Sequence, residues 1–114
     1  MGRLSDDLRL GAMLKKQARG DYETSRGRTC AVAAICDARG TLDQYDDAGI
    51  KAVENELDQL TPQAFCPVCK MGQTVSGVVI NLNDFHRWTR EKIADWLEPV
   101  EQPKKAQAAQ AVTA

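Results

Sequence analysis

One short segment constrains the fold more than any other: Cys66-Pro67-Val68-Cys69, two cysteines separated by two residues. Two thiolates at this spacing in a tight turn can hold one tetrahedral zinc ion, and Gly72 just beyond the pair favours such a turn. His86, the only histidine of the chain, follows Cys69 by seventeen positions. This distance leaves room for a helix that returns an imidazole to the turn, as in a zinc finger. The pattern therefore predicts zinc bound by Cys66, Cys69 and His86.

The fourth zinc ligand has to come from another part of the chain or be water. A zinc finger would carry a second histidine four or five positions before His86, where this chain has Asn81 and Leu82. Cys30 and Cys36 are better candidates, because thiolate is a strong zinc ligand. They are six positions apart, so one straight helix would place their side chains about 120° apart and about 9 Å along its axis. Only one of the two can then reach a given ion.

Cys30 is the favoured fourth ligand. It stands at the start of a predicted helix, where the positive end of the dipole lowers the pKa of a thiol, and Arg26 and Arg28 add positive charge nearby. Cys36 lies in the apolar interior of the same helix and is expected to be a packing residue. We therefore predict a closed, structural zinc site with these ligands: Cys30, Cys66, Cys69 and His86. Cys36 and water remain the alternatives to Cys30, and Cys30 itself could be only a small buried residue.

Two other interpretations of the cysteine pair and the histidine stay open. Cys66 and Cys69 could form a thioredoxin-like redox pair, which requires a strand before the pair and a helix beginning at its first cysteine. The flanking residues, Pro62-Gln63 and Lys70-Met71-Gly72, do not show that pattern. His86 could also be a core or helix-capping histidine rather than a metal ligand.

Apolar residues recur at helical spacing along much of the chain, so we predict a mainly α-helical fold. The expected helices cover residues 6–19, 30–39, 48–60, 77–86 and 90–98, with a short strand as the alternative for 77–86. The expected N-caps are Ser5, Thr29, Ser76 and Thr89. Gly20, Gly40 and the prolines at 62 and 99 are expected to end the helices before them. Residues 30–39 are apolar on nearly every side, which predicts a central, buried helix.

These elements predict one small zinc-stabilised domain over residues 1–100, with four to five helices, a zinc knuckle and at most one short hairpin. Residues 20–28 are expected to form a loop, and residues 101–114, rich in Ala and Gln, a flexible tail. A metal would add stability to a core of this limited size.

Charge and composition restrict the cellular setting. The net charge is −1, so no global basic field attracts nucleic acid or membranes. The chain has no apolar run of about 18 residues and no apolar signal segment at its start, so we expect no membrane span and a reducing compartment. Disulfides are rare there, which favours metal binding by the cysteines.

The sequence offers little for catalysis. It contains no Gly-rich phosphate loop, no Ser-His-Asp arrangement and no H-E-x-x-H motif, and its single histidine leaves few general bases. We therefore expect a protein that is not an enzyme and has no small-molecule substrate. Residues 1–30 carry seven basic against four acidic residues. A nucleic-acid-binding protein is therefore an alternative, with phosphate contacts from Arg26, Arg28, Arg87 and Arg90.

The segment CPVC…VVINLNDFHRWTREKIADWLEPVE, with the upstream TCAVAAICDA, resembles a group of small phage- and prophage-encoded proteins of unassigned function. The resemblance covers about residues 5–100 and is most specific over 66–98. It implies matching positions for Cys30, Cys66, Cys69 and His86. This chain departs from the group at Asn81, where members often carry histidine, which puts a plain zinc-finger site in doubt.

The resemblance indicates a viral origin but no activity. The expected function is a zinc-binding accessory protein that acts by binding a macromolecule, either as a virion component or as a host-directed regulator. Its partner would be a protein, such as another virion subunit, and its location the host cytoplasm or the virion. Nucleic-acid binding and a C-x-x-C redox role remain the alternatives.

Overall fold

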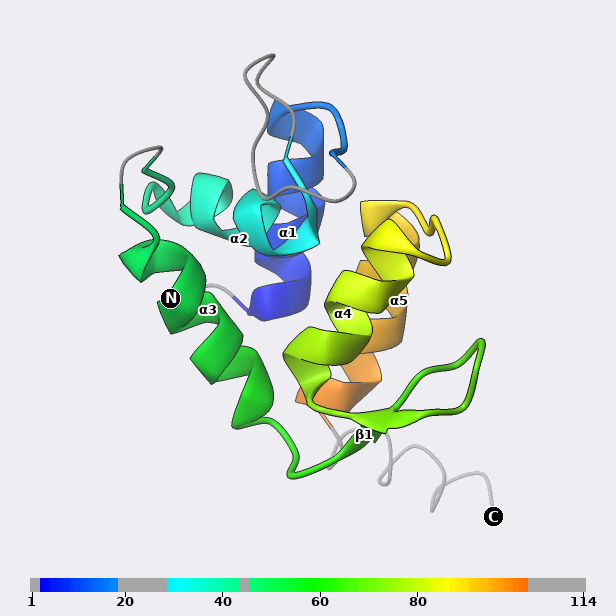
Figure 1. Cartoon of the computed structure of the whole chain (residues 1–114). Helices are drawn as coiled ribbons and strands as arrows, with labels where there is room; N and C mark the ends of the chain where they lie inside the picture. The colour runs from blue at the N-terminus through cyan, green and yellow to red at the C-terminus, as the bar shows by residue number, and fades with distance from the viewer. Residues whose placement is uncertain (1–2, 19–28, 44–45, 103–114) are drawn as a thin grey trace, which may run out of the picture.

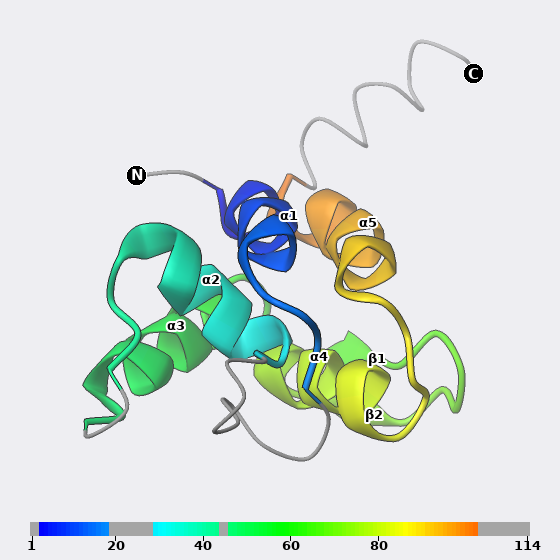
Figure 2. The same cartoon turned by 90° about the horizontal axis from the view of Figure 1, so that it is seen from above.

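The helix α2 (Ala31–Arg39) is the centre of the structure, a computed structural model that describes residues 3–18, 29–43 and 46–102. Every residue from Ala31 to Cys36 is buried, as its apolar sequence predicts. Figures 1 and 2 show α2 between α1 (Leu4–Leu14) and the pair α3 (Ala48–Asp58) and α4 (Val75–Asp84). The helix α1 approaches α2 closely at Gly11, where an added Cβ would lie only 1.9 Å from the carbonyl oxygen of Ala34.

Two further elements complete the fold. A two-stranded antiparallel hairpin, β1 (Ala64–Phe65) and β2 (Gly72–Gln73), lies between α3 and α4 in the chain, and α5 (Arg90–Glu101) follows α4. Within the described ranges the chain thus forms five helices and one short hairpin, which confirms the predicted fold class. None of the helices in these ranges combines the length and the apolar character that crossing a membrane requires.

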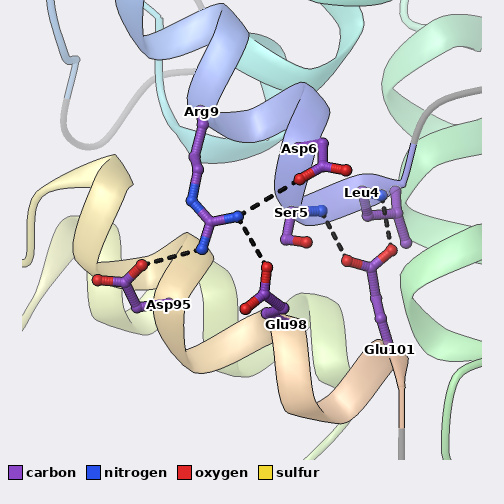
Figure 3. A network of polar contacts seen from close by, with 7 residues as sticks. All are labelled: Leu4, Ser5, Asp6, Arg9, Asp95, Glu98 and Glu101. Atoms are coloured by element: carbon purple, nitrogen blue, oxygen red, sulfur yellow. Dashed lines mark hydrogen bonds and ion pairs between the residues drawn. The ribbon is translucent and has the colours of Figure 1, made fainter. Parts of the chain in front are cut away.

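The helices α1 and α5 lie side by side in opposite directions (Figure 2). The Glu101 carboxylate at the end of α5 accepts hydrogen bonds from the backbone amides of Leu4 and Ser5, at O–N distances of 2.6 and 2.7 Å. Figure 3 shows this contact beside an ionic cluster in which Arg9 contacts acidic side chains of both helices. The acid supplies acceptors for amides that have no partner inside α1.

The structure corrects the first predicted helix. It ends at Leu14 rather than near residue 19, because the next residues pair with the chain before α2. The Ala18 amide donates to the Thr29 carbonyl, and the Thr29 amide donates to the Lys16 carbonyl, both at 2.8 Å. The predicted stop at Gly20 and the loop over 20–28 lie outside the described residues.

Three of the four predicted helix caps are wrong. Ser5 lies inside α1, and the Thr29 hydroxyl accepts a hydrogen bond from Arg90 instead of capping α2, where Cys30 is the N-cap. Ser76 lies inside α4, whose N-cap is Thr74. Thr89 caps α5 as predicted.

The remaining helix boundaries agree with the sequence to within a few residues. Gly40, in the left-handed conformation with φ of 71°, ends α2 as predicted, and α3 begins at 48 and ends two residues early at 58. The segment 77–86 is helical rather than extended, but its helix runs from 75 to 84. α5 continues through Pro99 to Glu101, so the predicted tail begins inside a helix, and residues 103–114 lie outside the described ranges.

Candidate metal site

The cysteine pair lies on the turn of the β1–β2 hairpin. Ala64 pairs with Gln73 and Phe65 with Gly72, which brings the two ends of the turn together. The Cys66 amide donates to the Met71 carbonyl at 3.0 Å, and the Lys70 amide donates to the Cys66 carbonyl at 2.9 Å. Lys70 adopts a positive φ of 66°, which reverses the chain after Cys69. Both thiols are therefore held on one tight loop.

His86 lies on a second tight turn, between α4 and α5. The helix ends at Asp84, and the Asn81 carbonyl accepts the amides of both Phe85 and His86, at 2.9 and 3.0 Å. Arg87 then takes a positive φ of 56°, which directs the chain into α5. His86 is thus fixed by the end of α4. The sequence predicted it inside a helix over 77–86, but it lies two residues beyond the end of that helix.

The two turns bring their donor atoms together. The Sγ atoms of Cys66 and Cys69 and a ring nitrogen of His86 all lie within 4.8 Å of one another. Ligands of a tetrahedral zinc ion, at about 2.0–2.3 Å from the metal, are separated by roughly 3.3–3.8 Å. Small side-chain adjustments would close the group around an ion, so these three residues could hold a metal, as predicted for them from the sequence.

The thiols of the pair differ in their surroundings. Cys66 is buried, Cys69 is exposed and His86 is half-buried. Burial raises the pKa of the Cys66 thiol, but hydrogen bonds from the amides of Cys69 and Val68 and from the Cys69 side chain outweigh it, so the pKa is lowered overall. A cysteine binds a metal as the thiolate, and these hydrogen bonds favour the thiolate form of Cys66.

Cys30 is not part of this group in the structure, contrary to its prediction as the fourth ligand. Its Sγ accepts a hydrogen bond from the Ala33 amide at 3.4 Å and caps α2. Burial raises the pKa of the Cys30 thiol to about 11 and outweighs the lowering effect of the Ala33 and Val32 amides. The amides at the start of α2 therefore lower the pKa of this thiol, as predicted, but desolvation raises it by more.

Cys36 is fully buried in α2, as expected of a packing residue, and burial likewise raises the pKa of its thiol. The structure thus brings together three of the four predicted ligands. Neither Cys30 nor Cys36 joins them.

Of the four arginines predicted to contact phosphate, the structure describes Arg87 and Arg90. Arg90 is 4% exposed, and its guanidinium donates to the Thr29 hydroxyl and the Lys15 carbonyl at 2.8 and 2.6 Å. Its prediction as a phosphate contact is wrong, because it is engaged inside the protein. Arg87 is exposed, and Arg26 and Arg28 lie outside the described residues.

The redox interpretation lacks one of its two structural requirements. The short strand β1 precedes Cys66, but no helix begins at that residue, and the chain turns back into β2 instead.

Sequence reasoning missed a set of exposed apolar side chains next to the donor residues in the chain. Four apolar side chains, each one or two positions from a donor residue, are exposed by 48–77%. We call them the apolar rim: Phe65, Val68, Met71 and Phe85. The available signal was their position on turns, where a side chain has little opportunity to reach the core.

A scan against protein-family models finds no match, and searches of curated proteins and of solved structures find none either.

Proposed function

We propose that the protein is a non-enzymatic, zinc-binding accessory protein that binds a protein partner through the face around its metal site. The observation that carries this proposal is the group formed by Cys66, Cys69 and His86, in which Cys69 is exposed and His86 half-buried. The viral origin suggested by the sequence resemblance makes the protein a virion component or a host-directed regulator.

Zinc suits these donors because two thiolates and an imidazole are ligands that it prefers. The thiolates belong to the β1–β2 hairpin and the imidazole to the turn between α4 and α5. An ion bound to all three would cross-link two turns that are otherwise connected through α4. Its role is then to fix the conformation of this face.

The apolar rim supports protein binding at the same face. Phe85, which directly precedes His86, is 77% exposed, and Met71, two positions after Cys69, is 61% exposed. Clustered apolar side chains on a protein surface often mark interaction sites, and Phe and Met are enriched at the centres of interfaces. Metal binding would hold the hairpin part of the rim and Phe85 in a fixed relative position.

The metal content of the untagged protein tests the first part of the proposal. Elemental mass spectrometry should find about one zinc per chain, because three protein ligands converge on one position. Cys69→Ser and His86→Gln should each lose most of it. An unmetallated protein, or zinc that persists in both variants, would contradict the proposal.

Partner binding is tested with matched surface variants. Phe85→Ser and Val68→Ser should abolish capture of a bacterial or phage protein that the wild type retains. Met13→Ser is the control, because Met13 is 83% exposed on α1 but is not part of the apolar rim. Equal loss in all three variants, or in none, would contradict binding through the rim.

A further inference from the structure

The chain supplies three donors where zinc normally has four ligands. His86 is the only histidine. The two remaining cysteines, Cys30 at the N-cap of α2 and Cys36 within it, lie outside the donor group. Beyond the described ranges, only Asp21 and Glu23 carry a carboxylate, thiol or imidazole side chain. The described structure therefore leaves one coordination position without a protein ligand.

The burial of the three donors shows where this position lies. Cys66 is buried, whereas Cys69 is exposed and His86 is half-buried. An ion bound among them would be covered on the Cys66 side and open on the side of Cys69. Three protein ligands and an accessible fourth position are the arrangement of a zinc site that exchanges ligands, in contrast to a closed structural site.

Charge near the site favours an anion in that position. Two thiolates would neutralise the two charges of the ion, and a neutral imidazole adds none. Lys70 and Arg87, both exposed, directly follow Cys69 and His86 in the chain. The nearby acid, Asp84, accepts a hydrogen bond from the Asn83 side chain at 2.8 Å. A carboxylate is anionic at neutral pH, whereas most free thiols are protonated.

The apolar rim indicates what carries the carboxylate. Phe65 and Phe85 directly precede Cys66 and His86, and Val68 lies between the two cysteines. A ligand with an apolar group beside its carboxylate would cover part of these side chains while its oxygen binds the metal. A protein chain offers this combination at an acidic residue, or a C-terminus, flanked by apolar residues.

We propose that the metal bound by Cys66, Cys69 and His86 keeps one coordination position open to solvent and takes there a carboxylate of a partner polypeptide, flanked by apolar side chains. This inference rests on the proposed metal site. It adds the chemical class of the partner group and makes the metal itself part of the binding surface.

Cobalt(II) in place of zinc provides the test, because its visible spectrum changes when a ligand enters or leaves. N-acetylleucine represents a carboxylate beside an apolar side chain, acetate the carboxylate alone, and N-acetylleucine amide the apolar group without the charge. The spectrum should change with N-acetylleucine at millimolar concentration, and with acetate only at about tenfold higher concentration. The amide should have no effect.

The rim is tested in the same assay. Phe85→Ser should reduce the preference for N-acetylleucine over acetate to near unity and leave the acetate affinity unchanged, whereas Met13→Ser should alter neither. Hexanoate that binds more than about tenfold tighter than N-acetylleucine would overturn the assignment to a polypeptide, because a free aliphatic acid would then be the better fit.

Two results would overturn the open position itself. One is cobalt that binds but does not respond to N-acetylleucine. The other is a cobalt spectrum altered by Cys30→Ser or by the double variant Asp21→Asn/Glu23→Gln, which would identify an internal fourth ligand. A protein that binds no cobalt and no zinc would instead refute the proposed metal site, so the two failures are distinguishable.

Discussion

The thiol of Cys30 takes the place of a side-chain oxygen at the start of α2. Its sulfur accepts the Ala33 amide, and the residue is 6% exposed. Burial raises its pKa from the ordinary 9.0 to about 11. Between these two values the folded protein retains a proton that the unfolded chain has lost. Folding stability from this group is therefore fully present below pH 9 and is lost as the pH rises towards 11.

The first prediction concerns Cys30→Ser, which keeps a capping acceptor but removes the titrating thiol. Zinc content should be unchanged, because Cys30 lies outside the donor group. The free energy of unfolding of the wild type should lose about 2–3 kcal/mol from this thiol between pH 9 and 11, and the variant should lack that part of the decline. Urea unfolding at a series of pH values, with zinc measured at each, gives both results. Loss of zinc in the variant would restore the four-ligand site predicted from the sequence.

At the scale of elements, α5 provides caps for both ends of α1. Glu101 accepts the first amides of α1, and Arg90 donates to the Ala12 and Lys15 carbonyls at its other end, at 3.3 and 2.6 Å. A basic residue at the start of α5 and an acidic one at its end oppose the dipole of α5 itself. Their favourable partners are on α1, which runs in the opposite direction. Both ends of α1 thus obtain charged partners from one neighbouring helix.

Glu101→Gln should therefore destabilise the protein by about 1–2 kcal/mol, because a neutral amide replaces a carboxylate that accepts two backbone amides. Glu98→Gln is the matched control. Glu98 is the exposed partner of Arg9 at 3.1 Å (Figure 3), and exposed ion pairs contribute up to about 1 kcal/mol. Chemical denaturation of both variants provides the comparison. Equal effects would mean that Glu101 is only another surface charge.

The crossing of α1 and α2 gives a third prediction. Gly11→Ala should cost about 2–4 kcal/mol or prevent folding, because the added methyl would meet the backbone oxygen of Ala34 at 1.9 Å. Gly77→Ala should change stability by less than about 1 kcal/mol, since its closest contacts, at 3.0 Å, are the side chains of Gln73 and Thr74. Thermal unfolding monitored by circular dichroism distinguishes the two. A stable Gly11→Ala protein would contradict the close packing of these helices.

Local pattern explains which elements could be predicted from the sequence. The helix at 31–39 is a short apolar run ended by Gly40, and the helices at 48–58 and 90–101 carry apolar stripes, so their approximate positions follow from local pattern. The end of α1 at Leu14 depends on Thr29 and Arg90, which are distant in sequence, and no local signal marks it. In the site, the spacing of Cys66, Cys69 and His86 predicted their proximity. The exclusion of Cys30 depends on how α2 packs, which spacing does not encode.

In the whole molecule, the donor group and the main core occupy different regions. The core is built around α2, with apolar side chains from all the other helices. The donor group lies on the hairpin turn and on the turn after α4, and only Cys66 of its three residues belongs to the core. Figure 1 shows the hairpin projecting beside α4, away from α2. A metal bound here would therefore organise an edge of the protein and would not connect to the central helix, contrary to what a Cys30 ligand would imply.

This separation leads to the last prediction, on metal removal. Chelation should release the hairpin and the α4–α5 turn while the core around α2 stays folded, because stability is distributed unevenly and peripheral turns open first. Hydrogen exchange measured by mass spectrometry should show protection falling by about tenfold or more over residues 64–73 and 85–88, but little change over the buried residues 31–36. His86→Gln should reproduce this pattern without chelator, and Cys30→Ser should not. Uniform loss of protection would mean that the metal supports the whole fold. In that case the site would be a structural centre of the kind that a closed four-ligand shell provides.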